Sequence, residues 1–170
     1  MPETTPRTLV IYYSFQGSTR CIAKAIAEAL QGDLLELVPD SQPWGHGLGA
    51  YLWFGWQRIR HRLPRLAPLD KDPADYDLIF LGTPVWSWDM SLPMQAFLRQ
   101  LAFMDENLAL FCCCKGDPGK TLSAMEEALV GNRILGSQTF IDVPANTDLA
   151  VKEASRWAQE IAAQVEVHDT

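Results

Sequence analysis

Residues 14–19 (SFQGST) place three hydroxyl side chains around one glycine, between an apolar run and a segment with helical spacing. The first backbone N–H groups of a helix have no partner within the helix, and the helix dipole favours an anion there. The hydroxyls of Ser14, Ser18 and Thr19 add donors, and Gly17 lets the backbone approach a ligand closely. This pattern indicates a phosphate site that needs no lysine, although the same residues could form only a helix cap and a tight turn.

Residues 82–90 (GTPVWSWDM) carry two tryptophans directly after an apolar run. Large aromatic side chains at the end of a strand are costly to expose, and a planar aromatic ligand can cover one of them. Trp86 and Trp88 could equally belong to the core or to an interface. Taken alone, this segment leaves both interpretations open.

Residues 114–119 (CKGDPG) form a glycine-rich segment after a further apolar run. Its glycines free backbone N–H groups to face the edge of a ring. Gly119, Lys120 and Thr121 suggest the end of a nucleoside-triphosphate loop, but such a loop needs a glycine where Cys114 stands. The segment also follows the fourth expected strand and not the first, so we reject a triphosphate site.

These three segments lie between elements that alternate along the chain. Short apolar runs predict strands, and apolar residues at helical spacing predict helices. The expected strands are 8–13, 33–38, 76–82, 107–114 and 133–142. The expected helices are one from Ser18 to a cap at Gly32, then 91–103, 120–130 and 147–165, with Ser91 and Pro93 opening the second. This alternation predicts a parallel sheet with helices on both faces, in which ligands bind beyond the carboxyl ends of the strands.

One stretch, about 40–75, interrupts the alternation and is the most basic part of an acidic protein. Its aromatic residues and arginines are Trp44, Tyr51, Trp53, Phe54, Trp56, Arg58, Arg60, Arg62 and Arg65. Three interpretations stay open: a lid over the ligand, a docking surface for a partner protein or a membrane surface, or an irregular crossover with its aromatic side chains in the core. Exposed aromatic side chains here could also serve a dimer.

The composition bounds the class of protein. With 170 residues, 48% of them hydrophobic, the chain is long enough to form one domain, residues 1–170, with its own core. A net charge of -7 argues against a nucleic-acid partner, which normally requires a basic surface. No signal-peptide pattern and no run of 18 apolar residues is visible, so we expect a cytoplasmic protein without a membrane span.

Neither the cysteines nor the histidines form a recognisable site. Residues 112–114 are consecutive cysteines, which cannot easily bridge one another on a strand, and Cys21 stands alone. We expect buried, reduced thiols. His46, His61 and His168 are spread along the chain without ligand spacing, so we assign no metal and no general acid–base residue.

Together, the three segments resemble the flavodoxin family, specifically its branch with a T-P-V-W loop. The resemblance covers nearly the whole chain: the S-x-x-G-x-T motif of residues 14–19, the G-T-P-V-W motif of residues 82–86, Pro93 with residues 97–98, and the cysteine-rich strand that runs into Gly116. The first two motifs, about 65 residues apart, carry most of the specificity.

The resemblance implies a flavodoxin-like α/β sandwich with a five-stranded parallel sheet in the order 2-1-3-4-5, and flavin mononucleotide (FMN) as cofactor. It implies a phosphate site made of Ser14, Gln16, Gly17, Ser18 and Thr19. It implies contacts to the ribityl chain and the isoalloxazine ring from Thr83, Pro84, Val85, Trp86 and Ser87. It implies a lining of the pyrimidine side by Cys114, Lys115, Gly116 and Asp117.

The sequence departs from short flavodoxins at three places. Gln16 stands where they have a hydroxyl residue, residues 86–89 lack their glycine, and the third loop lacks their stacking tyrosine.

Three functions are compatible with this resemblance. The first is an electron-transfer protein that exchanges electrons with a partner oxidoreductase, toward which an acidic surface could steer it. The second is an NAD(P)H-dependent FMN enzyme that reduces quinones or free flavin. The third is a binding module that keeps the fold without the flavin. Because a flavin itself performs the difficult chemistry, the lack of an acid–base pair excludes neither of the first two.

Overall fold

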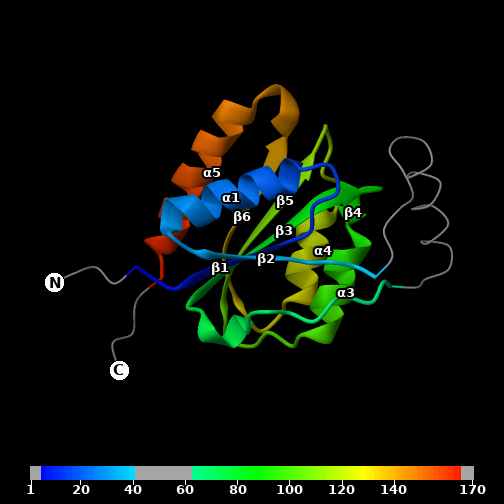
Figure 1. Cartoon of the computed structure of the whole chain (residues 1–170), viewed down its shortest axis with the longest axis vertical. Coiled ribbons are helices and arrows are strands. Elements are labelled where there is room, and N and C mark those ends of the chain that lie inside the picture. Colours follow the sequence, from blue (N-terminus) through cyan, green and yellow to red (C-terminus); the bar gives the residue numbers. More distant parts are fainter. Residues whose placement is uncertain (1–4, 41–62, 166–170) are drawn as a thin grey trace.

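The computed structural model describes residues 5–40 and 63–165. Five parallel strands form its sheet, in the order β2-β1-β3-β5-β6 (Figure 1). They are β1 (Thr8–Tyr12), β2 (Asp33–Glu36), β3 (Leu78–Trp86), β5 (Asn107–Cys114) and β6 (Arg133–Ile141). The predicted fold class and strand order are confirmed.

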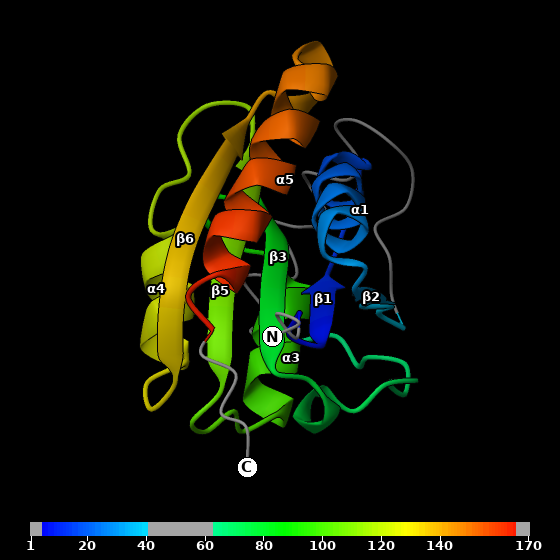
Figure 2. The same cartoon turned by 90° about the vertical axis from the view of Figure 1, so that its left-hand side faces the viewer.

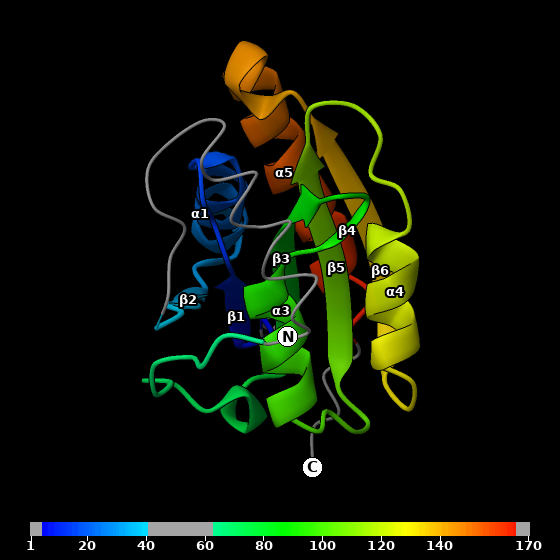
Figure 3. The same cartoon turned by 90° about the vertical axis from the view of Figure 1, so that its right-hand side faces the viewer.

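Helices cover both faces of the sheet. Figures 2 and 3 show α1 (Ser18–Leu30) and α5 (Thr147–Ala162) on one face, and α3 (Leu92–Gln100) and α4 (Thr121–Ala128) on the other. Two short 3-10 helices, η1 (Pro73–Asp75) and η2 (Val143–Ala145), precede β3 and α5. Among the helices of the described ranges, none has the length and apolar character that crossing a bilayer requires.

Alternate residues of each central strand pack against opposite helix layers. On β3, Phe80 packs with the residues of α1 and α5, whereas Ile79 and Leu81 pack with those of α3 and α4. All three side chains are fully buried. This two-sided burial explains why the strands read as continuous apolar runs without polar alternation.

The helix starts follow the sequence closely, whereas α3 and α5 end three residues earlier than predicted, at Gln100 and Ala162. Ser91 caps α3 by accepting a hydrogen bond from the Met94 N–H (3.4 Å), as predicted. At the end of α1, however, Gln31 and not Gly32 adopts the left-handed conformation (φ 52°). The Gly32 N–H then donates to the carbonyl of Ala27 (2.9 Å), so the two residues close the helix together.

The third strand is longer than predicted. Residues 83–86, expected in a loop, continue β3, and the short antiparallel strand β4 (Asp89–Met90) pairs with its end. Ser87 and Trp88 form the two-residue turn between them, both at positive φ (50° and 61°). Glycine or asparagine usually occupies such turns, so serine and tryptophan at these positions did not predict a hairpin.

The ends of the predicted insertion lie side by side. Pro39 bridges Leu66, and the N–H of Asp40 donates to the carbonyl of Arg65 (2.8 Å). The predicted aromatic residues and all its arginines except Arg65 lie outside the described residues.

Candidate functional site

Three loops leave the sheet at the same edge. Tyr12 pairs with Gly82, and Gly82 with Phe111, in neighbouring parallel strands. The segments that follow these residues, 13–17, 83–91 and 114–120, therefore meet at the carboxyl edge of the sheet (Figure 3). This arrangement brings the three predicted sets of site residues to one edge.

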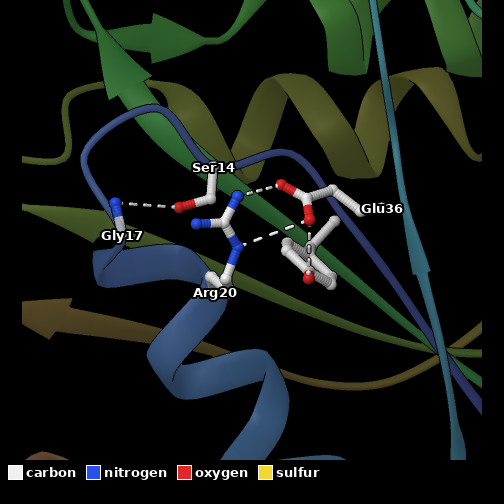
Figure 4. A network of polar contacts seen from close by, with 5 residues as sticks. Ser14, Gly17, Arg20 and Glu36 are labelled. Carbon is white, nitrogen blue, oxygen red and sulfur yellow. Dashed lines mark hydrogen bonds and ion pairs between the residues drawn. The ribbon is translucent and has the colours of Figure 1, made fainter.

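The first loop has the geometry of an anion cradle. Gly17 occupies the N-cap of α1 in a left-handed conformation (φ 95°), and its N–H donates to the hydroxyl of Ser14 (3.2 Å; Figure 4). Among the described residues, no side chain caps this end of α1. A Cβ atom added to Gly17 would meet none of their atoms within 4 Å, so within this part of the structure open space adjoins the first turn of the helix. The loop fits a phosphate group bound by backbone N–H groups.

The hydroxyl residues of this loop differ in their surroundings. Ser14 and Thr19 are buried, Ser18 is half-buried and Gln16 is exposed. The side chain of Thr19 hydrogen-bonds with the thiol of Cys113, so the protein itself already engages this hydroxyl.

An ion pair adjoins this loop. The guanidinium of Arg20, the third residue of α1, binds Glu36 of β2 through both carboxylate oxygens: Nη2 to Oε1 at 2.5 Å and Nε to Oε2 at 3.3 Å (Figure 4). The hydroxyl of Tyr12 donates to the same Oε2 (3.2 Å). Burial, followed by the Glu36 charge, raises the pKa of Tyr12, so its hydroxyl stays protonated. This group was not predicted from the sequence, in which the arginine directly after Ser18 and Thr19 was the available signal.

Aromatic rings line the edge beside the first loop. Trp86 contacts Tyr13 edge-on, with ring centroids 5.4 Å apart, and Phe15 in the same manner at 6.4 Å. Tyr13 is buried, and burial raises its pKa to about 12, whereas Phe15 and Trp86 are half-buried. Edge-on packing fixes the Trp86 ring between these neighbours.

The hairpin of β3 and β4 is joined to the third loop. The Lys120 N–H donates to the carbonyl of Trp88 (3.0 Å), and the Lys120 ammonium pairs with Asp89 (3.3 Å). Gly119 lies directly against Trp88, because a Cβ on this glycine would come within 2.4 Å of the Trp88 Cβ. The side chain of Trp88 itself is 65% exposed.

Thr83 has a structural contact inside the protein. Its side chain is completely buried, its hydroxyl oxygen accepts from the Ser91 N–H (3.0 Å), and it lies 2.9 Å from the Ser91 hydroxyl. These bonds tie the end of β3 to the cap of α3. Among the other predicted residues of this segment, Trp86 is the last residue of β3, Ser87 lies exposed in the hairpin turn, and Pro84 and Val85 are half-buried.

The third loop is open and carries no activated thiol. Lys115, Gly116 and Asp117 are exposed, and a Cβ on Gly116 would meet no atom of the described residues within 4 Å. The Cys114 thiol donates to the Gly116 carbonyl (3.2 Å). Burial raises the pKa of this thiol, and it raises the pKa of Cys112 to about 11, so both remain neutral at pH 7. Over ranges 5–40 and 63–165, no group of three potential metal ligands occurs.

Comparison with known proteins gives one family match and one group of curated relatives. The flavodoxin family model matches residues 7–131. An NAD(P)H dehydrogenase (quinone) of Caulobacter vibrioides is 35% identical over 97 residues, which are 54% of this chain and 44% of that relative. The chain therefore matches less than half the length of the curated relatives.

Two solved structures illustrate the likeness of fold. A flavoprotein in complex with FMN from Lactobacillus acidophilus superposes with a TM-score of 0.68 at 24% identity, over 84% of this chain and 97% of that one. A Fusobacterium nucleatum flavodoxin bound to FMN gives 0.61 at 11% identity, over 95% and 99% of the two chains. Because the family model extends from β1 through α4, across all three loops of the site, this chain belongs to the flavodoxin family.

Proposed function

We propose that this protein binds one FMN at the carboxyl edge of its sheet and exchanges electrons with a partner oxidoreductase. The observation that carries the proposal is the first loop, where an uncapped helix start and the open space beside Gly17 form an uncharged phosphate cradle. The half-buried ring of Trp86 lies next to this loop through its contact with Phe15. A phosphate-bearing planar ligand suits both features.

Each of the three loops contacts a different part of the ligand. Ser14, Gly17 and Ser18 bind the phosphate, with Gln16 at the exposed rim and Thr19 supporting the loop from the core. The ribityl chain and the ring contact Trp86, Ser87 and the backbone of residues 83–85. The pyrimidine side faces residues 114–117. When bound, the flavin supplies the redox chemistry, while the chain orients it and limits its contact with water.

A second function is favoured by one specific observation. The Caulobacter relative is an NAD(P)H dehydrogenase (quinone). On this basis the chain would itself accept hydride from NAD(P)H and reduce a quinone. We rank this function second, because the matched segment covers less than half of that relative.

One experiment tests FMN binding and separates the two functions. The purified full chain is expected to be yellow, or to become yellow with FMN and to quench its fluorescence. Under anaerobic conditions in a stopped-flow instrument, NADPH alone is expected to leave the flavin oxidised, and a flavodoxin reductase is expected to be required for bleaching. Rapid bleaching by NADPH alone would establish the enzyme instead. A colourless chain that ignores added FMN would show a binding module without flavin.

A further inference from the structure

Among the described residues, Arg20 brings a full positive charge beside the phosphate cradle. Residues 14–19 contain no ionisable side chain, and the helix start supplies only about half an elementary charge. A phosphate monoester carries up to two negative charges at neutral pH, and the chain as a whole carries -7, which repels anions. Arg20 is the nearest cation in sequence, since it follows Thr19 directly.

The ion pair with Glu36 leaves part of the guanidinium available. A guanidinium has five N–H donors, and the bonds of Arg20 to Glu36 involve only Nε and Nη2. Within the part of the chain that the structure describes, Nη1 has no hydrogen-bond partner. In the view of Figure 4, the edge formed by Nη1 and Nη2 is turned toward the loop that carries Ser14 and Gly17.

The carboxylate holds the guanidinium in this orientation. Glu36 pairs in register with Tyr12 across the two neighbouring strands and accepts the Tyr12 hydroxyl bond. Tyr12 is 3% exposed, so the carboxylate is anchored to the core. A planar guanidinium bound through one edge keeps its other edge in a fixed direction, which suits two-sided recognition of a carboxylate and a phosphate.

Resting on the proposed function, we propose that Arg20 is a specificity-determining residue that selects the phosphorylated flavin. The edge formed by Nη1 and Nη2 binds the phosphate of FMN, while Nε and Nη2 keep their bonds to Glu36. In the view of Figure 4, the guanidinium lies between this loop and the Glu36 carboxylate, an arrangement in which the pair attracts a phosphate. Riboflavin, which lacks the phosphate, gains nothing from this residue.

The test compares two ligands that differ only in the phosphate. The flavin-free full chain is titrated with FMN and with riboflavin by fluorescence quenching. Arg20→Gln is expected to weaken the binding of FMN about 5- to 20-fold and the binding of riboflavin less than twofold. An effect of this size corresponds to the loss of one charged hydrogen bond that partial exposure to water has weakened. Added salt should also reduce the preference for FMN over riboflavin in the wild type, and it should reduce that preference less in Arg20→Gln.

Two further variants separate phosphate binding from structural effects. Lys24→Gln removes the same charge one turn later, from the exposed face of α1, and should change neither affinity more than twofold. Glu36→Gln breaks the ion pair and loosens the orientation of the guanidinium but keeps its charge, and should retain part of the preference for FMN.

Equal losses for both flavins in Arg20→Gln, or no loss for either, would overturn the inference while leaving the proposed function intact. The inference would fail in the same way if Glu36→Gln lost the FMN preference as fully as Arg20→Gln, because the arginine would then act only by tying α1 to β2. If the wild type binds neither flavin, the inference and the proposed function fall together.

Discussion

Gly17 joins two requirements in one residue, a left-handed backbone at the helix start and space for an anion. Gly17→Asp places a carboxylate beside the bound phosphate, so we expect FMN retention to be lost. Gly17→Asn is the matched control, because asparagine has nearly the same shape, tolerates positive φ and carries no charge. Both variants are titrated with FMN by fluorescence quenching. Equal affinity in the two variants would show that no anion lies at Gly17.

Trp86 is the residue that the proposal places against the flavin ring. We expect Trp86→Ala to weaken the binding of FMN by about 1–3 kcal/mol, which is the usual cost of losing one stacking partner. Trp86→Phe keeps an aromatic ring and should lose less. Trp88→Ala removes the other tryptophan of the hairpin, which is 65% exposed, and should have the smaller effect on FMN. If calorimetric titration shows a larger loss of FMN affinity in Trp88→Ala than in Trp86→Ala, the flavin ring lies instead at the outer face of the hairpin.

At the scale of elements, the β3–β4 hairpin depends on its contact with the third loop. Gly119→Ala would place a methyl group 2.4 Å from the Trp88 Cβ at a positive φ of 56°. We expect a loss of about 1–3 kcal/mol in the free energy of unfolding, from strain and from displacement of the hairpin.

Gly116→Ala is the control for this variant, since it lies in the same loop and its new methyl group would meet no atom within 4 Å in the described part of the chain. Urea denaturation of both variants measures the difference. Equal stability would mean that the hairpin can move away from the loop without cost.

The elements also show which features a sequence can reveal. The strands and helices were predictable because apolar periodicity and caps such as Ser91 are local signals. The hairpin was not predictable, because Ser87 and Trp88 adopt left-handed conformations. These conformations are imposed by the pairing of β4 with β3 and by the contact of Trp88 with Gly119. Likewise, the bond between Arg20 and Glu36 spans 16 positions and exists only once β2 lies beside β1. Contacts set by the fold leave no periodic trace in the chain.

At the scale of the whole molecule, the parallel sheet explains both the position of the site and its inert thiols. All four cysteines are free, and the two most buried, Cys112 and Cys113, lie near the carboxyl end of β5, between β3 and β6. Burial raises the pKa of both. Their protonation also links the stability of the whole fold to alkaline pH.

The direction of this linkage follows from the protons that each state binds. Burial raises the pKa of Cys112 from 9.0 to about 11, so between these values the unfolded chain releases a proton that the folded protein keeps. The stabilising contribution is therefore complete below about pH 9 and declines as the pH rises toward 11. Tyr13, with a pKa raised to about 12, acts in the same direction above pH 10.

We expect the free energy of unfolding to fall between pH 8.5 and pH 10.5 by at most about 1.4 kcal/mol per pH unit for each such thiol. Cys112→Ala removes one titrating group and should show a shallower decline, together with a pH-independent loss from the smaller side chain. Urea denaturation across this range, with a reductant present, measures both slopes. Parallel slopes in the two proteins would mean that Cys112 ionises as readily in the folded state as in the unfolded chain, and that the sheet does not shield this thiol from water.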